Sequence, residues 1–575
     1  MSRVLWFPYV ALVCCATVFA QTAIHNQEGD PDDDIVSAIP LNAPIDTSIH
    51  PGPGSPTGTG RPPRIGVNQR VNALQQPFPN GLLGRSETTI TGTTDGQNVL
   101  AGWNDAQGFC GPPFGVACTP AGGLSGFGFS TNGGATFTDG GAPFIQNHIY
   151  TRGDPWMDLG GLDNNTFFYA NLAVDDVTAA NLGVSVHRGH FSATGFNFED
   201  VTAFNATNTP HDLYDKEAIA TAKDSSGAGI VTVTNFISVC GFDQAGSGQI
   251  EVWRTHNGGA TWEGPAIAAP DTTTPNNIND PNCGATQILQ QSSAPAIGPN
   301  GEMYAVWQFG PTFTATTTST NADIFFTRSL DGGVTFSTPK SLAAINSFRQ
   351  DPPVGYSRDR MNDHPRIAVA TTGPNRGRVY VVFYSALAPV TAATASHAAC
   401  LSPPTPTSRC RPQRLTSSQV FLKFSDDQGQ TWSNAIALAP APPATGVKRW
   451  WPVVNVEPSG NVDVIFNQSL EQPVASGALC TINVGGGIRR QGTAHSLVDI
   501  YWVQSTNGGS AFGSPVKASS ATNDWCTAAS NITPNFGDYI GSFSGGNRVF
   551  AAWGDSRSGA VDVEAVPILG AGKSK

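Results

Sequence analysis

Short apolar stretches, each followed by a glycine-containing turn and a second apolar stretch, recur along most of the chain. Residues 294–307 give the clearest copy, in which Ala-Pro-Ala-Ile leads through a turn into Met-Tyr-Ala-Val-Trp. Residues 452–466 repeat this arrangement, and residues 365–383 give a third copy. Looser copies start near Ser86, Pro155, Glu217 and Tyr539. Short apolar runs bounded by turn residues predict β-hairpins, and we count seven of them.

A second phrase follows five of these hairpins. It consists of a hydroxyl residue, any residue, Asp or Asn, any residue, Gly, any residue, usually Thr, and an aromatic residue. It occurs at residues 130–137, 255–262, 329–336, 425–432 and 505–512. Gly at the fifth position can adopt a positive φ without steric cost, and the Asp or Asn side chain can accept backbone N–H groups within the turn. The phrase therefore predicts a tight strand reversal, and its repetition predicts one supersecondary unit used several times.

This phrase is the Asp-box, and on its five copies the chain resembles the sialidase-like (BNR-repeat) β-propeller superfamily. The resemblance implies an all-β fold, a single propeller of four-stranded antiparallel blades. In that family the phrase lies on the hairpin of each blade, away from the reaction centre. The resemblance thus identifies the expected fold, whereas the Asp-box residues themselves have structural roles.

The number of blades follows from counting the second hairpins. Besides the five with an Asp-box, residues 184–198 give a degenerate one, and residues 561–569 give only one strand. A propeller ring has to be closed, so the missing outer strand is expected from residues 65–74. We expect one seven-bladed propeller over residues 62–570. Six blades, as in the sialidases of the family, are the alternative.

The composition agrees with a chain of many short strands. Charged residues make up 13% of the 575 residues, and the chain contains 64 Gly and 43 Pro. The net charge of −12 argues against nucleic acid as a partner. It does not exclude an anionic ligand, because a few Arg residues can dominate one cleft. The oligomeric state is not predicted.

The N-terminus predicts export. Residues 1–20 combine Arg3 with an apolar run and small residues before Gln21, as in a cleavable secretory signal. We see no other candidate for a membrane span, and we expect a secreted or extracytoplasmic protein. Residues 21–61 form an acidic and Pro/Gly-rich tail that cannot bury enough apolar surface to order itself.

Eight cysteines remain after cleavage, an even number that suits disulfide bonds in an exported chain. Neighbours along the chain suggest the pairs Cys110–Cys118, Cys240–Cys283, Cys400–Cys410 and Cys480–Cys526. The chain has no Cys-x-x-Cys phrase and no Cys/His cluster. We therefore expect no metal, and no cofactor signature is seen.

Polar and aromatic residues precede the expected innermost strands, and in a propeller these positions converge from all blades. They include residues 152–156, 215–217, 358–366, 449–451 and 538–539. Arg can bind a carboxylate through two N–H groups, and Trp faces can stack on sugar rings. Because side chains alternate along a strand, Trp450 and Trp451 are not expected to point inward together.

The resemblance implies roles for some of these residues, since sialidases use three Arg on the substrate carboxylate, a Tyr nucleophile assisted by a Glu, and an Asp as acid and base. It implies Tyr539 as nucleophile, Glu217 as its partner, and Asp154 or Asp363 as the acid. Candidate substrate-binding residues are Arg85, Arg152, Arg366, Arg449, Trp156 and Trp450. The family phrase Phe/Tyr-Arg-Ile-Pro is absent around Arg85. Each Asp could instead brace a turn between blades, and Tyr539 could be a packed channel residue.

The function expected from these observations is an exported, sialidase-like carbohydrate-active protein. It would be an exo-glycosidase acting on acidic glycans at the mouth of the channel. A polysaccharide lyase, with Tyr539 or His364 abstracting a proton, is possible on the same fold. The alternative is a non-catalytic propeller that binds glycans or proteins at the cell surface or in the secreted fraction, and a purely structural surface protein is the third hypothesis.

Overall fold

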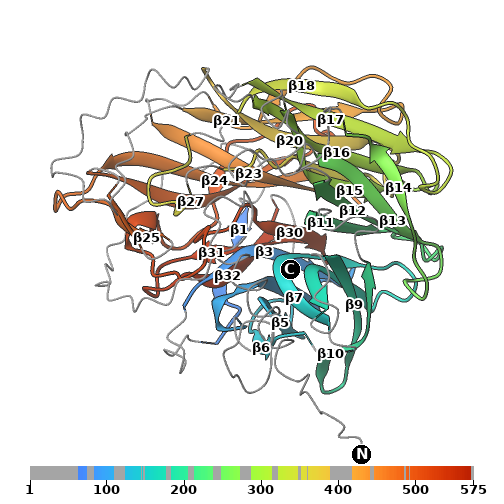
Figure 1. Cartoon of the computed structure of the whole chain (residues 1–575), viewed down its shortest axis with the longest axis horizontal. Helices are drawn as coiled ribbons and strands as arrows, with labels where there is room; N and C mark the ends of the chain where they lie inside the picture. The colour runs from blue at the N-terminus through green and yellow to red at the C-terminus, as the bar shows by residue number, and fades with distance from the viewer. Residues whose placement is uncertain are drawn as a thin grey trace, which may run out of the picture.

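The computed structural model shows one β-propeller. The described residues are 63–73, 83–108, 123–143, 146, 149–175, 183–204, 213–236, 248–271, 287–313, 321–347, 351–358, 361–388, 417–440, 446–484, 487–490 and 493–570. Within them, seven antiparallel sheets form the blades, and their first strands gather around the axis (Figure 1). The all-β, seven-bladed prediction is confirmed, and the six-bladed alternative is excluded.

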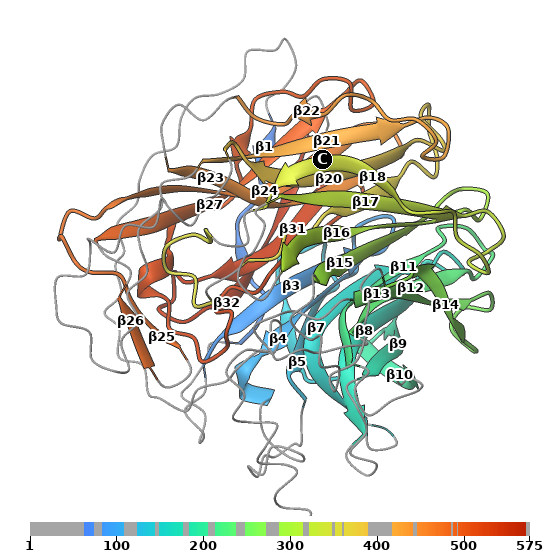
Figure 2. The same ribbon diagram turned by 45° about the horizontal axis from the view of Figure 1, so that its top comes forward.

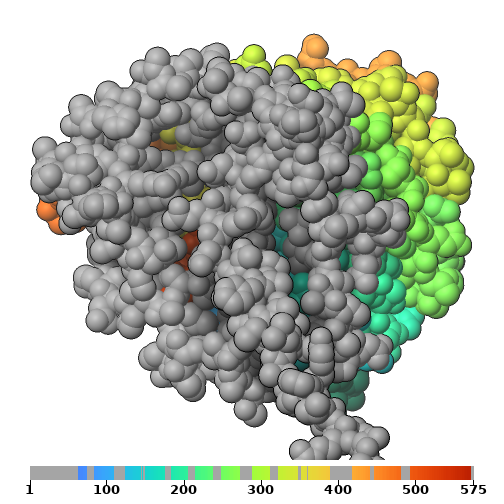
Figure 3. All heavy atoms as spheres, in the orientation of Figure 1, coloured from blue at the N-terminus to red at the C-terminus, as the bar shows by residue number. Residues whose placement is uncertain are grey.

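The first four blades follow one another along the chain, each with four strands. The first contains β3 (Arg85–Gly92), β4 (Val99–Asp105), β5 (Ser125–Ser130) and β6 (Thr138–Gly141). The second contains β7 (Ile149–Leu159), β8 (Thr166–Asp175), β9 (Gly183–Ser192) and β10 (Gly195–Phe204). The third contains β11 (Leu213–Thr221), β12 (Gly229–Phe236), β13 (Gly248–Thr255) and β14 (Glu263–Ala269). The fourth contains β15 (Gln287–Ile297), β16 (Met303–Phe313), β17 (Asn321–Ser329) and β18 (Lys340–Asn346). The third and fourth blades form the green and yellow rim in Figure 3.

The fifth and sixth blades continue the ring. The fifth contains β19 (Arg366–Val369), β20 (Val379–Ala386), β21 (Ser418–Ser425) and β22 (Ile436–Ala437). The sixth contains β23 (Val447–Val456), β24 (Val462–Pro473), β27 (Ala494–Ser505) and β28 (Val516–Lys517), and β29 (Asn523–Asp524) also pairs with β27. A separate hairpin of β25 (Thr481–Val484) and β26 (Gly487–Arg490) stands apart from the sheets (Figure 2). Two short 3₁₀ helices are η1 (Ala106–Gly108) and η4 (Trp525–Thr527).

The last blade is completed by the N-terminal end of the propeller. It contains β30 (Gly541–Gly545), β31 (Arg548–Asp555) and β32 (Asp562–Leu569), and β32 pairs with β1 (Arg64–Ile65) and β2 (Gln69–Arg70). In this pairing Ile65 lies opposite Ile568, and Gln69 lies opposite Ala565. The expected closing strand is therefore present, and it ties the two ends of the ring together.

The second strands of the blades are buried on both faces, because neighbouring blades pack on each side of them. Every residue of β4 and of β12 is buried, including the polar ones. Strands buried on both faces carry near-continuous apolar runs rather than a strict alternation, which is why these segments were readable in the sequence. The fourth strands are more exposed, as in β6 and β14.

Five first strands share a bulge at the same place. Each bulge shifts the register with the second strand and holds one non-glycine residue at positive φ. These residues are Glu87 (50°), Asp154 (55°), Lys216 (50°), Ser292 (63°) and Trp451 (48°). An extra residue in one strand bends it and re-aims a side chain. In this propeller the bulges direct side chains toward the axis or the core.

The bulge in β23 overturns the expectation for the two tryptophans. Trp450 and Trp451 are both buried, and both rings contact the ring of Trp525. Strict alternation fails because Trp451 has a positive φ and the register shifts between Trp450 and Val453. Both rings are core residues of the sixth blade.

The Asp-box turns have the hydrogen bonds that their sequence predicts. In the first, the Ser130 hydroxyl accepts from the Gly134 amide at 3.0 Å, and the Asn132 side chain accepts from the Thr136 amide at 3.0 Å. The other four turns repeat both bonds. Gly134 has a φ of +76°, a backbone conformation that would be strained for a residue with a side chain.

Of the expected disulfides, Cys480–Cys526 is present and links the residue before β25 to η4. The other three pairs lie outside the described residues, as do residues 1–20 and 21–61. Among the described residues, no helix has the length and apolar character needed to cross a bilayer.

Candidate functional site

Charged side chains from four blades meet at the propeller axis around Lys216. Its Nζ lies 3.0 Å from Glu87 Oε1, 3.0 Å from Asp154 Oδ2 and 3.3 Å from Asp538 Oδ2. Glu87, Asp154 and Lys216 are the bulge residues of the first three blades. Burial alone would lower the pKa of Lys216, but the Asp154, Glu87 and Asp538 carboxylates raise it well above its usual value. Lys216 is thus a buried ammonium held by three carboxylates.

Asp538 connects this ammonium to the segment before β19. Its carboxylate accepts a hydrogen bond from the Tyr356 hydroxyl at 2.6 Å, forms an ion pair with Arg358, and accepts from Asn362 Nδ2 at 3.4 Å. Buried charges of this kind are stable only when they are paired and hydrogen-bonded. The Asp538 carboxylate therefore fixes the relative positions of the fifth and seventh blades at the axis.

Glu217 lies beside Lys216 in the chain but has a different environment. It is buried, and neither of its carboxyl oxygens has a hydrogen-bond partner of good geometry among the described residues. Burial raises the pKa of Glu217 well above its usual value, as does the Asp154 carboxylate, while Lys216 and nearby backbone amides offset this only in part. The surroundings of Glu217, next to Asp154, therefore favour its protonated form.

Tyr539 lies in an aromatic and cationic wall. Its ring is 5.7 Å from that of Trp156 and 5.7 Å from that of His364, and the guanidinium of Arg366 lies 5.1 Å from the Tyr539 ring. The Tyr539 hydroxyl donates to the Pro155 carbonyl oxygen at 3.0 Å. Burial raises the pKa of Tyr539 well above its usual value, and Glu87 and Asp154 raise it further. These surroundings favour the neutral phenol over a nucleophilic phenolate.

Asp363 and His364 form hydrogen bonds with the neighbouring fourth blade. The Asp363 carboxylate accepts from the Ser347 hydroxyl, and its amide donates to Gln308 Oε1 at 2.9 Å. His364 Nε2 lies 3.2 Å from the hydroxyl of Ser292, the bulge residue of the fourth blade. Both residues thus brace the junction between the fourth and fifth blades.

The structure brings six of the ten candidate residues close to the axis. These are Tyr539, Glu217, Asp154, Asp363, Arg366 and Trp156. Arg85 is instead paired with Asp105 at 3.0 Å and with Asp562 at 3.4 Å, across the closure between the first and last blades.

The remaining candidates lie elsewhere. Arg449 donates to Gln468 Oε1 at 2.7 Å and to the Pro440 carbonyl at 2.6 Å, and Trp450 belongs to the core around Trp525. Arg152 is partly buried on β7. The three-arginine carboxylate clamp of sialidases is not assembled from these residues, because the side chains of Arg85 and Arg449 are committed to other partners.

Sequence reasoning missed Glu87 and did not assign a role to Lys216. Glu87 comes after Ser86, where the first hairpin was expected to start, so the rule that functional residues precede the expected first strands did not include it. The available signal was positional: Glu87, Asp154 and Lys216 are charged residues two to three positions before apolar strand residues in three successive copies of the hairpin.

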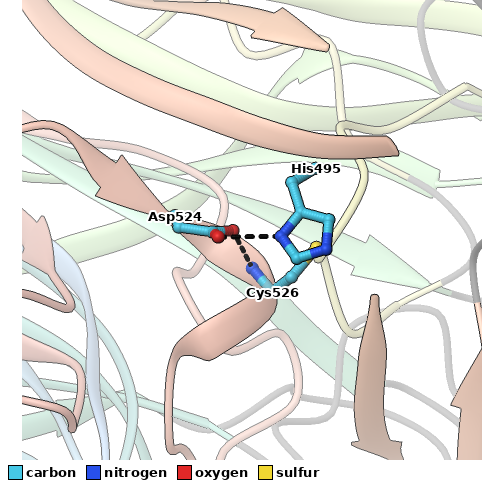
Figure 4. Close-up of side chains that lie close together, drawn as sticks. All are labelled: His495, Asp524 and Cys526. Carbon is cyan, nitrogen blue, oxygen red and sulfur yellow. Dashed lines mark hydrogen bonds and ion pairs between the residues drawn. The ribbon is translucent and has the colours of Figure 1, made fainter. Parts of the chain in front are cut away.

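One group of side chains has metal-ligand chemistry. His495, Asp524 and Cys526 place their ligand atoms within 4.8 Å of one another (Figure 4). However, the Cys526 sulfur is bonded to Cys480, and the imidazole has a partner on each nitrogen: Asp524 Oδ2 at 2.7 Å on Nδ1 and the Ala478 carbonyl at 3.1 Å on Nε2. A disulfide sulfur is not a thiolate ligand, so this group stabilises the fold and does not suit a metal ion.

Comparisons with known proteins give fold likenesses only. No protein-family model matches the chain, and no curated protein does either. An α-L-arabinofuranosidase of Fusarium graminearum in complex with arabinobiose is 11% identical, with a TM-score of 0.39, over 70% of this chain and 92% of that chain. An α-L-arabinanase of Penicillium chrysogenum is 12% identical, with a TM-score of 0.36, over 74% and 94%. The sialidase of Trypanosoma rangeli is 11% identical, with a TM-score of 0.38, over 78% and 59%. At such low identity and TM-score these likenesses do not bear on what this chain binds or cleaves.

Proposed function

We propose that the protein is an exported glycoside hydrolase whose reaction centre is the axial cluster of Glu217, Asp154 and Lys216. One observation carries the proposal: a buried carboxyl group without a hydrogen-bond partner lies beside a carboxylate that an ammonium group holds at 3.0 Å. Two carboxyl groups whose surroundings drive their protonation states apart are the usual acid and base of glycoside hydrolysis.

The chemistry assigns a role to each group. Glu217 donates its proton to the glycosidic oxygen as the bond to the anomeric carbon breaks. The Asp154 carboxylate stabilises the positive charge that develops on the sugar ring. Water then adds to the anomeric carbon, and the proton that it releases returns to Glu217, so the enzyme is regenerated. Lys216 holds Asp154 in place through their ion pair.

This assignment differs from the roles that the sialidase resemblance implies. There Tyr539 is the nucleophile and Glu217 assists it. Here the Tyr539 hydroxyl donates to Pro155 rather than to Glu217, and burial raises the pKa of Glu217, which makes it a poorer base. Tyr539 is therefore a positioning residue in the proposed site.

A non-catalytic binding propeller is the second candidate. The observation that favours it is the burial of the cluster: the exposed fractions are 0% for Glu87, 2% for Asp154, 2% for Lys216 and 2% for Glu217. A buried ionic cluster can also serve only to hold blades together. In that case the protein would bind a glycan or a protein at its surface and leave it intact.

A cleavage and binding screen separates the two candidates. The mature protein is assayed on sialosides, uronic-acid glycans and neutral glycans, with binding measured in parallel. For any glycan that is cleaved, Glu217→Gln should lower kcat by about 10²–10⁴-fold. Glu564→Gln is the matched control, because Glu564 is another buried carboxyl whose pKa is raised by burial, to about 7, but it lies in the last blade and outside the cluster.

Cleavage that survives Glu217→Gln unchanged would refute the assignment of the acid. Binding without cleavage of any glycan would establish the second candidate. Loss of activity in both Glu variants would point to folding rather than chemistry, and the free energy of unfolding of each variant identifies that case.

A further inference from the structure

A cavity follows the axis beyond the ionic cluster. It has a volume of about 750 Å³ and is lined by residues from the first strands of all seven blades. In the first strands that carry cluster residues, the lining residues come after them: Thr88–Gly92 follow Glu87, and Ile219–Thr221 follow Glu217. All first strands run in the same direction along the axis. The cavity therefore lies on the side of the cluster toward which these strands run. It reaches the turns between first and second strands, on the face that carries the Asp-box turns.

Arg366, the first residue of β19, lines this cavity. Its side chain is 5% exposed, and its guanidinium carbon lies 4.0 Å from the Trp156 ring centroid and 5.1 Å from that of Tyr539. Trp156 and Tyr539 line the cavity with it. Nη1 of Arg366 has no hydrogen-bond partner, and Arg366 forms no ion pair with a carboxylate among the described residues.

The neighbouring cations are different in this respect. Lys216 has three carboxylates within 3.3 Å, and Arg358 is paired with Asp538. Burial lowers the pKa of Arg366 to about 9, with Tyr539 and Glu87 opposing the change, so the guanidinium is charged at neutral pH. A buried charge without a counter-ion is unstable unless a partner arrives from solution, and the aromatic rings supply only part of the stabilisation.

We propose that the axial cavity is a second ligand site, separate from the cluster, that binds a small organic acid with its carboxylate on Arg366. The guanidinium presents parallel N–H donors that match one carboxylate. The volume suits an organic molecule rather than a bare halide. The walls alternate aliphatic and hydroxyl groups, such as Val453, Ile367 and Thr91, which suits a body of mixed polarity.

The mouth of the cavity does not compete for the same ligand. Its basic residues already have partners: Lys223 lies 2.5 Å from Asp158, Arg376 donates to the Pro299 carbonyl at 2.9 Å, and Arg548 donates to the Gly133 carbonyl at 3.1 Å. Arg366 is thus the cation of the cavity at which an incoming carboxylate would form the most stabilising ion pair. A single guanidinium also favours a monoanion over a phosphate dianion.

The test is calorimetric titration of the full mature protein with sodium glucuronate, sodium acetate, sodium chloride and methyl glucoside. Glucuronate should bind, acetate more weakly, and methyl glucoside at least about tenfold more weakly than glucuronate, since charged hydrogen bonds are worth roughly 1.5–3 kcal/mol. Arg366→Met should abolish the preference for glucuronate over methyl glucoside. Arg376→Met is the matched control, because it removes a cation from the mouth, and it should bind glucuronate within about twofold of wild type.

Three results would overturn the proposal. They are equal affinities for glucuronate and methyl glucoside, an unchanged preference for glucuronate over methyl glucoside in Arg366→Met, or a heat of binding with sodium chloride alone. If Arg366→Met does not fold, the wild-type preference and Arg366→Lys, which keeps the charge but not the paired donors, still decide. The proposal is independent of the hydrolase, because Glu217→Gln should bind glucuronate as wild type does.

Discussion

Arg548 of the last blade donates from Nη1 to the Gly133 carbonyl oxygen in the Asp-box turn of the first blade, at 3.1 Å. The same pattern recurs at the other four Asp-box turns, each of which accepts a guanidinium N–H from the preceding blade. The pairs are Arg188 with Gly258, Arg254 with Gly333, Arg328 with Gln428, and Arg378 with Gly508. The Asp-box thus shapes a turn whose carbonyl groups dock the neighbouring blade.

Replacing Arg548 should weaken closure of the ring. Arg548→Met removes the bond to Gly133 and a second one to the Gly96 carbonyl, so we expect the free energy of unfolding to fall by about 1.5–3 kcal/mol. Arg64→Met, at an exposed position of the closing strand β1, should change it by less than about 0.5 kcal/mol. Denaturant titration of both variants checks this, and equal stability of the two would contradict the docking role.

Removing the central ammonium should be far more costly. Lys216→Met leaves Glu87, Asp154 and Asp538 buried together without their cation, and we expect a loss of about 3–5 kcal/mol at pH 7. Lys223→Met, whose ion pair is 40% exposed on the Lys side, should lose no more than about 1 kcal/mol. Unfolding of both variants in denaturant measures these losses, and equal losses in the two would contradict the central role of the Lys216 ammonium.

His495 should make stability depend on pH. Burial alone would lower the pKa of His495, but its hydrogen bond to Asp524 and the charge of Asp524 raise it above its usual value. The stabilisation is therefore fully present below the unfolded pKa of about 6.5 and is lost as pH rises through the folded pKa. Unfolding measured between pH 5.5 and 8.5 should show this decline. His495→Gln should flatten it, and an identical slope in the variant would place the titration elsewhere.

The disulfide should contribute through the chain segment that it closes. Cys480 and Cys526 are 46 residues apart, and loss of a native disulfide costs about 2–5 kcal/mol. We expect the double variant with both cysteines replaced by Ser to unfold at lower denaturant concentration, and wild type in reducing buffer to behave like it. Full stability of the double variant would mean that the hydrogen bonds around His495 suffice to hold this segment.

The fold was predictable because its signals are local. Turn chemistry at residues 130–137 and its four copies, and the alternation that places Ile65 opposite Ile568, depend on a few neighbouring residues. The site was predictable only in part. A residue before a first strand does reach the axis, as Asp538 shows, but the bulges that aim Glu87, Asp154 and Lys216 at the axis depend on packing between blades.

The sequence also does not predict which side chains form ion pairs with one another. Arg85 and Arg366 both stand near the start of a first strand, yet Arg85 pairs with Asp105 and Asp562, while Arg366 forms no ion pair within the described part of the chain and packs on Trp156 and Tyr539. Residue type does not distinguish these outcomes, because the partners come from distant segments. Trp451 illustrates the same limit, since its positive φ cancels the alternation rule that otherwise holds along β23.

Infrared absorption of the carboxyl groups at pH 7 in wild type and Glu217→Gln tests the proposed acid most directly, because it needs no knowledge of the substrate. The band of protonated carboxyl groups should be weaker in Glu217→Gln than in wild type, and this loss should exceed the loss in Glu564→Gln, whose carboxyl group has a pKa of about 7 and is only about half protonated. Identical spectra for wild type and Glu217→Gln would contradict it, since an ionised Glu217 could not donate the proton on which the proposed hydrolysis depends.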